Sequence, residues 1–235
     1  MLIGPQNLPL NVQKVRTAIG AAATQCGRSV DSVTLLAVSK GQSAASVRAV
    51  AAAGVGHFGE NYLQEALPKL DALADLALTW HFIGRLQANK TRLVAERFDW
   101  VHGIDRLKLA ERLASQRPYH APPLNVCIQV NVAGESGKAG VGLAEVAALA
   151  AAVRTLPHLR LRGLMCLPPE ETDGARQRHW FALVRASFDA LRAAGFDIDT
   201  LSMGMSGDFA AAIAEGATLV RIGTAVFGPR AAAPA

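Results

Sequence analysis

Lysine is the residue type whose placement first suggests chemistry in this sequence. One of only six lysines, Lys40, ends an apolar run, Val33–Ser39, that has the composition of a buried strand. On a strand, Lys40 lies on the same face as Leu36 and Val38, so its side chain is expected at the mouth of a barrel. A lysine partly withdrawn from water has a lowered pKa and is suited to Schiff-base formation with an aldehyde. Taken alone, the segment equally allows a lysine that reaches the rim without a chemical role.

The other lysines have ordinary explanations. Solvated helix faces, a helix start and a glycine-rich loop account for Lys14, Lys69, Lys108, Lys90 and Lys138. The loop, Gly134–Gly140, is expected to leave Lys138 with an exposed and mobile head group. Lys40 is therefore the lysine to which a reaction is assigned.

Two glycine-containing turns near the end of the chain predict a site for an anion. The segment Ser202–Asp208 follows one predicted strand and leads into a helix, with Ser206 expected at the N-cap. The segment Arg221–Gly228 follows the next strand and contains Gly223 and Thr224. Turns of this kind expose backbone N–H groups, and barrels commonly hold phosphate between their last two loops. With a lysine ending the first strand, the combination indicates a phosphorylated aldehyde, pyridoxal 5′-phosphate (PLP).

Arg221 ends the last predicted strand, within reach of a ring whose phosphate occupies the following turn. An arginine cannot give up a proton, so opposite a pyridine nitrogen it leaves that nitrogen neutral and a poor electron sink. The alternative is an ion pair between Arg221 and a carboxylate of the barrel.

These residues are positioned by an alternation of short β-rich runs and longer segments with helical periodicity. About eight repeats without a hairpin signal favour a parallel sheet, and eight units in about 200 residues favour an α/β fold of the (β/α)8 TIM-barrel type. We predict a single domain, residues 1–235 with a core at about 10–230, preceded by an extra N-terminal helix. The expected strands are Val33–Ser39, Val55–Gly59, Leu78–Ile83, Trp100–Gly103, Leu124–Val132, Leu161–Cys166, Thr200–Met203 and Leu219–Ile222. The expected helices are 10–26, 43–53, 61–74, 88–97, 105–116, 143–155, 174–194 and 206–214.

One glycine motif is rejected. Gly54–Gly59 matches G-x-G-x-x-G, but dinucleotide binding requires a strand before the motif and a helix opening within it. Here an alanine-rich helical run precedes the glycines and a strand runs through them. We interpret Gly54 as the end of a helix.

At this point the sequence resembles a known family, the pyridoxal-phosphate homeostasis proteins, which are single-domain PLP-binding barrels related to the N-terminal barrel of alanine racemase. The resemblance extends from about residue 10 to residue 230, and its motifs together are highly specific. The matching stretches are Leu35–Lys40, Phe58–Tyr62, Trp80–Gly84, Leu86–Lys90, Arg162–Met165, Leu201–Ser206 and Val220–Gly228.

The resemblance implies a role for each residue of the site. It implies that Lys40 holds PLP as a Schiff base, that Arg221 faces the ring nitrogen, and that other residues hold the phosphate or line the ring. The phosphate residues are Ser206, Gly223 and Thr224, and the ring residues are Asn61 and Ile83. Departures from the family pattern are Arg85, Gly41 and Gly207, of which Gly207 touches the phosphate loop.

Three functions from different classes compete. The resemblance implies a protein of intracellular PLP homeostasis that binds the cofactor without robust turnover. The alternative is an amino-acid racemase or related PLP enzyme, for which Tyr62 is the one conceivable second base. Nucleic-acid binding rests only on a formal net charge of +5, and the arginines are scattered without an aromatic-interleaved stripe. We expect no nucleic-acid or membrane partner.

The remaining features lead to simple expectations. The three cysteines are far apart and without metal-ligand spacing, which is typical of reduced thiols and a cytoplasmic protein. His57 and His81 are expected to be packed in strands rather than bound to a metal, and Cys166 is expected in the core. No signal peptide or transmembrane span is expected. We expect a monomer, with client PLP enzymes as possible partners.

Overall fold

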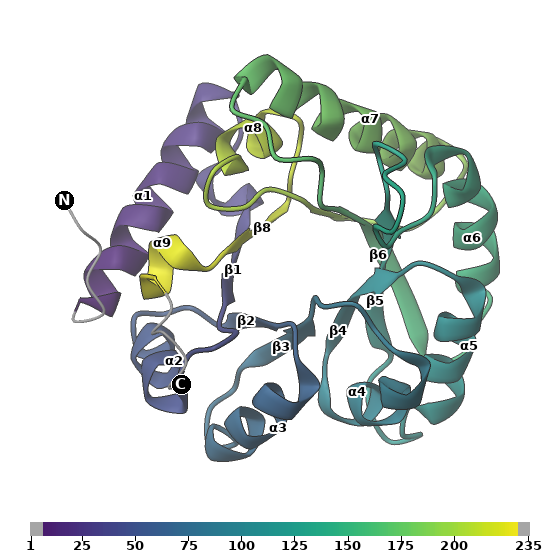
Figure 1. Cartoon of the computed structure of the whole chain (residues 1–235), viewed down its shortest axis with the longest axis horizontal. Helices are drawn as coiled ribbons and strands as arrows, with labels where there is room; N and C mark the ends of the chain where they lie inside the picture. The colour runs from purple at the N-terminus through teal and green to yellow at the C-terminus, as the bar shows by residue number, and fades with distance from the viewer. Residues whose placement is uncertain (1–6, 230–235) are drawn as a thin grey trace.

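The computed structural model is a closed barrel of parallel strands surrounded by helices (Figure 1). It describes residues 7–229, so both ends of the predicted 1–235 domain, including residue 230, lie outside the described residues. The strands pair in chain order and β1 closes against β8, which confirms the (β/α)8 architecture. The strands are β1 (Thr34–Val38), β2 (His57–Glu60), β3 (Thr79–Phe82), β4 (Trp100–Ile104), β5 (Leu124–Val130), β6 (Leu159–Cys166), β7 (Thr200–Ser202) and β8 (Leu219–Ile222).

The helices form the outer ring in Figure 1. They are α1 (Leu8–Gln25), α2 (Ala44–Ala52), α3 (Leu63–Ala72), α4 (Thr91–Arg97), α5 (Leu107–Gln116), α6 (Val146–Val153), α7 (Gly174–Ala193), α8 (Phe209–Ala214) and α9 (Thr224–Phe227). Short 3-10 turns are at Val30–Ser32, Ala88–Lys90 and Leu143–Glu145. The expected N-terminal helix is α1, which is fixed to the end of the barrel because Asn11 Nδ2 donates to the Val226 carbonyl at 3.0 Å.

The two faces of the sheet have different compositions. Leu35 and Ala37 belong to the large apolar core between strands and helices, whereas the intervening Leu36 is buried outside that core. This period of two follows from strand geometry, in which successive side chains point to opposite faces. Inside the barrel, Trp100 and Met165 belong to a small separate apolar cluster. The remaining interior space is available for polar side chains.

The structure corrects the predicted start of one helix at Ser206 and confirms that Gly54 follows the end of another. Helix α8 begins at Phe209 rather than at residue 206, and the N-cap position is Asp208, so Ser206 is not the N-cap. The reason is a tight turn in which Asp208 Oδ1 accepts a hydrogen bond from the Met205 N–H at 2.5 Å. Gly54 follows α2 with φ of +88° and leads into β2, so the G-x-G-x-x-G segment has no helix opening within it.

Of the three cysteines, Cys166 lies in the core as expected, whereas Cys26 is exposed. Cys127 and Cys166 are buried thiols, and burial raises the pKa of each to about 12. From residue 7 to residue 229, no helix is both long and apolar enough to cross a membrane. No cluster of potential metal ligands occurs in the same range.

Candidate functional site

All the residues predicted to hold the cofactor line one cavity of about 650 Å³. It lies at the carboxyl ends of the strands, the end at which barrels place their sites. Lys40 follows β1, Asn61 follows β2 and Ile83 follows β3. Arg221 belongs to β8 itself, and the turns after β7 and β8 supply Ser206, Gly223 and Thr224. The structure thus brings together residues that are up to 184 positions apart in the sequence, from Lys40 to Thr224.

A buried charged cluster supports the strand end that carries Lys40. Lys69 of α3 donates to Glu60 Oε1 at 2.5 Å and to the Ser39 carbonyl at 2.7 Å. The Ser39 hydroxyl donates to the same Glu60 oxygen at 2.6 Å. Because both charged side chains are buried, the expectation of a solvated Lys69 is wrong. The cluster fixes the main chain one residue before Lys40.

Arg221 is held at the floor of the cavity by neutral acceptors. One terminal nitrogen donates to the Ser202 carbonyl at 2.5 Å and the Ser202 hydroxyl at 2.8 Å, and the other donates to the Cys166 carbonyl at 2.8 Å. Its alternative interpretation, an ion pair with a carboxylate, has no support among residues 7–229 because no salt bridge there includes Arg221. Burial lowers the pKa of Arg221, but a guanidinium remains protonated in proteins. Of its five N–H donors, Nε–H and one terminal N–H have no acceptor within the described chain.

The turns after β7 and β8 present unused backbone donors on neighbouring strands. Within the described part of the chain, the N–H groups of Ser206, Gly207, Gly223 and Thr224 have no hydrogen-bond acceptor. Gly204 makes the first turn possible, because it has φ of +94° and a Cβ there would lie 2.7 Å from the Ala212 Cβ. These donors suit a phosphate group.

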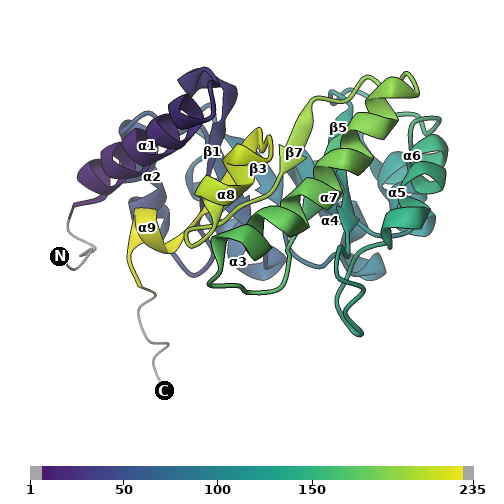
Figure 2. The same cartoon turned by 90° about the horizontal axis from the view of Figure 1, so that it is seen from above.

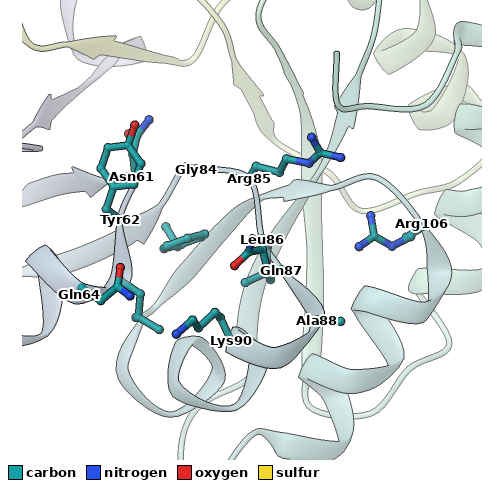
Figure 3. Close-up of a pocket in the computed structure, with 12 residues that line it drawn as sticks. Asn61, Tyr62, Gln64, Gly84, Arg85, Leu86, Gln87, Ala88, Lys90 and Arg106 are labelled. Carbon is teal, nitrogen blue, oxygen red and sulfur yellow. The ribbon is translucent and has the colours of Figure 1, made fainter. Parts of the chain in front are cut away.

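Asn61 lies between this cavity and a second cavity of about 630 Å³ (Figure 3). Its Oδ1 is buried without a hydrogen-bond partner within residues 7–229. Gly84 packs directly behind it, since a Cβ on Gly84 would lie 2.2 Å from the Asn61 carbonyl oxygen. The second cavity is lined by the cationic side chains of Arg85, Lys90 and Arg106, the last of which is paired with Asp105.

The loop between β5 and α6 contributes two charged residues to the first cavity. It projects from one end of the barrel in Figure 2, and it places Glu135 and Lys138 at the cavity wall. Lys138 Nζ donates to Glu135 Oε1 at 2.6 Å, so the expected mobile head group is in fact paired. Lys138 is therefore a second amine beside the site.

Sequence reasoning missed two residues behind Arg221. His102 of β4 and Ser202 of β7 are fully buried inside the barrel, and His102 Nδ1 lies 2.9 Å from Ser202 Oγ. His57 and His81 are packed in strands as expected, and they continue the same line of side chains. The available signal was strand parity, because these residues share the inward-facing positions of their strands.

The donor set of the first cavity fits PLP. A lysine amine suits an aldehyde, unused backbone N–H groups suit a phosphate, and the open edge of Arg221 suits a ring nitrogen that accepts a hydrogen bond. The carboxylates that line the cavity, Glu135 and Glu170, lie on the loops after β5 and β6 rather than on the turns after β7 and β8.

Comparison with known proteins agrees with this reading of the site. Residues 11–231 match the family model described as "Alanine racemase, N-terminal domain". The chain is 56% identical over 220 residues to the pyridoxal phosphate homeostasis protein of Pseudomonas aeruginosa, covering 94% of each chain. It is 53% identical over 223 residues to the protein of that name from Escherichia coli K12, covering 94% of this chain and 95% of the relative. The structure of PipY of Synechococcus elongatus with PLP bound is similar with a TM-score of 0.76 and 40% identity, covering 84% of this chain and 93% of that one.

Proposed function

Because this chain belongs to the pyridoxal phosphate homeostasis protein family, we propose that it binds PLP in the cavity at the barrel mouth and serves intracellular PLP homeostasis. The observation that carries the proposal is the convergence of Lys40, Arg221 and the two phosphate turns on one cavity. PipY, a relative that is 40% identical, has a structure with PLP bound. We propose the whole chain, residues 1–235, as one PLP-binding domain.

Different residues of the cavity bind different parts of the cofactor. Lys40 is the covalent attachment site, and Ser206, Gly223 and Thr224 bind the phosphate through hydroxyl and backbone donors. Asn61 and Ile83 line the ring, and Arg221 donates to the ring nitrogen. When bound, PLP supplies an electrophilic carbon and an electron-withdrawing ring.

We propose that the protein holds PLP without robust turnover. Arg221 is a permanent cation with no proton to transfer, so a ring nitrogen beside it stays neutral. Tyr62, the one candidate for a second base, is 57% exposed and lines the second cavity rather than the first. A racemase needs a base on each face of the reacting carbon. Besides Lys40, the basic groups that line the first cavity are Lys138 and Glu135, which are paired with each other, and Glu170.

The remaining parts of the proposal concern the protein's setting. We propose a cytoplasmic monomer whose partners are PLP itself and client PLP enzymes, with no nucleic acid and no membrane. Reduced buried thiols and the absence of a membrane-spanning helix within residues 7–229 support this setting.

Borohydride reduction of the PLP-loaded protein tests the attachment site. After proteolysis, mass spectrometry should find the reduced cofactor on the peptide that contains Lys40. The Lys40→Ala variant should lose this label, and Lys108→Ala, which changes an exposed lysine of α5, should keep it. Label on the Lys138 peptide of the wild type would contradict the assignment of Lys40.

Solvent-deuterium exchange at the Cα of added amino acids tests turnover. The loaded protein should leave the enantiomers of alanine, serine and glutamate optically pure and undeuterated over hours. Exchange at about 1 s⁻¹ or faster, which is an enzyme-like rate, would instead support the racemase alternative. If that exchange vanished in Lys40→Ala, Tyr62→Phe would be the next variant to assay.

A further inference from the structure

A line of hydrogen-bonded side chains crosses the interior of the barrel and ends at Arg221. His57 Nδ1 lies 3.0 Å from His81 Nε2, and His81 Nδ1 lies 2.9 Å from His102 Nε2. His102 Nδ1 lies 2.9 Å from Ser202 Oγ, which in turn accepts from Arg221 at 2.8 Å. We refer to His57, His81 and His102 together with Ser202 as the histidine chain. The histidine chain has no part in the cofactor contacts described above.

Strand order explains how the histidine chain is built. The histidines lie on β2, β3 and β4, which are neighbours in the barrel, and Ser202 lies on β7 across the interior. Trp100 keeps the middle ring in place, because its indole stacks on His81 with centroids 5.2 Å apart and planes 17° apart. The chain begins at the other end of the barrel, where partly buried His57 lines a cavity of about 480 Å³ beside the first residues of β1 and β2.

Arg221 sets the direction of every hydrogen bond in the histidine chain. A guanidinium only donates, so Ser202 Oγ must accept from it. Within the described residues, His102 Nδ1 is then the acceptor that the buried Ser202 hydroxyl proton can reach. A neutral imidazole that accepts at Nδ1 donates at Nε2, so His102 donates to His81 and His81 donates to His57. All the histidines of the chain therefore carry their proton on Nε2.

The reverse direction is disfavoured by burial. If His102 donated to Ser202, the hydroxyl proton would lack an acceptor at a site with no solvent exposure. A charged histidine in the middle would place two donors face to face. Burial lowers the pKa of His102 to about 3, with Arg221 adding repulsion, and lowers that of His81 well below its ordinary value. The rings are thus neutral near pH 7.

We propose that the histidine chain is a positioning device for Arg221, which it holds with the Nε–H edge open to the cofactor cavity. The proposal rests on the proposed function in that the open edge is meant for the ring nitrogen of PLP. Ser202 uses both hydrogens of one terminal nitrogen through its carbonyl and hydroxyl, so the guanidinium cannot rotate without losing both bonds. His102 Nδ1 accepts the Ser202 hydroxyl proton on the far side, and His81 accepts from the Nε2–H of the resulting His102 tautomer. His102 and Ser202 are positioning residues that never touch the cofactor.

Histidine side-chain NMR on the cofactor-free protein tests the direction of the chain. Two-bond ¹H–¹⁵N correlation spectra at pH 7 should show His57, His81 and His102 as neutral Nε2–H tautomers. In the Arg221→Leu variant, Ser202 no longer has an obligatory donor, and the tautomer of His102 should no longer be uniform. An Nδ1–H or charged state for His81 or His102 in the wild type would overturn the proposal. This measurement does not depend on whether the protein binds PLP.

Two substitutions at one position test the positioning. His102→Leu removes the acceptor for Ser202, whereas His102→Asn can return an acceptor oxygen near the position of Nδ1. We expect His102→Leu to weaken PLP binding about tenfold, the scale of one hydrogen bond to a charged group, and to shift the absorbance maximum of the bound cofactor. His102→Asn should restore both readouts toward the wild type.

The controls separate positioning from folding and from the proposed function. His120→Leu changes an exposed histidine and should leave affinity and spectrum unchanged. Circular dichroism and thermal unfolding show whether the His102 variants are folded, and affinities are compared only between folded variants. Equal affinity and spectrum for wild type and folded His102→Leu would overturn the proposal. Failure of the wild type to bind PLP would instead overturn the proposed function and leave the tautomer result standing.

Discussion

Two buried polar clusters lie on opposite faces of the same sheet, and they satisfy their side chains in different ways. Outside β2, a carboxylate and an ammonium, Glu60 and Lys69, meet beneath the strand end that carries Lys40. Inside the barrel, the histidine chain runs through neutral rings to Arg221. The first cluster joins residues at most 30 positions apart, whereas the second joins residues 100 positions apart at its longest step.

The two clusters differ in how their buried polar groups are compensated for the loss of water. In the charged cluster, an ion pair compensates desolvation, but incompletely. Burial raises the pKa of Glu60 despite Lys69, and Glu60 Oε2 has no hydrogen-bond partner within residues 7–229. In the histidine chain the rings are neutral, so no charge has to be desolvated. Each ring must, however, carry its proton on Nε2 for every hydrogen bond to form. Stability therefore depends on the ion pair, and orientation of the cofactor site depends on the histidine chain.

Breaking the charged cluster should give the largest effect. Lys69→Met leaves the Glu60 carboxylate buried without its partner, and we expect a loss of about 3–5 kcal/mol in the free energy of unfolding. Urea denaturation would measure it. The double variant Glu60→Leu with Lys69→Met should recover most of the loss, because it removes both charges. A loss below about 1 kcal/mol in Lys69→Met would show that Glu60 is already neutral in the wild type, contrary to the ion pair.

Acid should weaken the protein through the histidine chain by a smaller amount. His102 has a pKa of about 3 in the fold against an ordinary value of 6.5, so the unfolded state binds more protons between these values. Its contribution to stability is present above pH 6.5 and is lost as the pH falls toward 3. At pH 5 the loss from His102 alone is about 2 kcal/mol.

Urea denaturation across this pH range, compared between wild type and His102→Asn, isolates the contribution. The difference in slope between the two proteins should be largest from pH 6 down to pH 4. Parallel slopes would contradict the low pKa of His102.

An exposed ion pair serves as the reference for both clusters. Arg185 and Asp189 form a pair on α7 with N···O of 2.6 Å, and each side chain is about half exposed. Asp189→Asn should change the free energy of unfolding by only about 0.3–0.5 kcal/mol, less still in high salt. An effect as large as that of Lys69→Met would remove the distinction between buried and exposed charge on which the comparison depends.

The fold was predictable because its signal is local and repeated. Each strand has its own apolar run and each helix its own periodicity, so the alternation itself specified the barrel. The position of Lys40 at the barrel mouth was predicted from neighbouring residues alone, because strand parity depends only on them. The start of α8 was less predictable, because Asp208 competes with Ser206 for the same turn and accepts the Met205 N–H.

The two buried clusters were not predictable in the same way. Nothing in α3 distinguishes Lys69 from a solvated lysine until β2 presents Glu60 to it. His102 and Ser202 become partners only when closure of the barrel brings β4 opposite β7. Residue types and their spacing along the chain do not predict which side chains meet across the barrel.

The close packing of Gly84 against the Asn61 carbonyl has a consequence for anyone who would redesign this protein. Asn61 lines both cavities, and even one added methyl group on Gly84 would lie 2.2 Å from the Asn61 carbonyl oxygen. Libraries that vary the barrel mouth should therefore hold position 84 constant and diversify Arg85, whose exposed side chain lines only the second cavity. Selection for a new ligand in the second cavity would then proceed without moving Asn61.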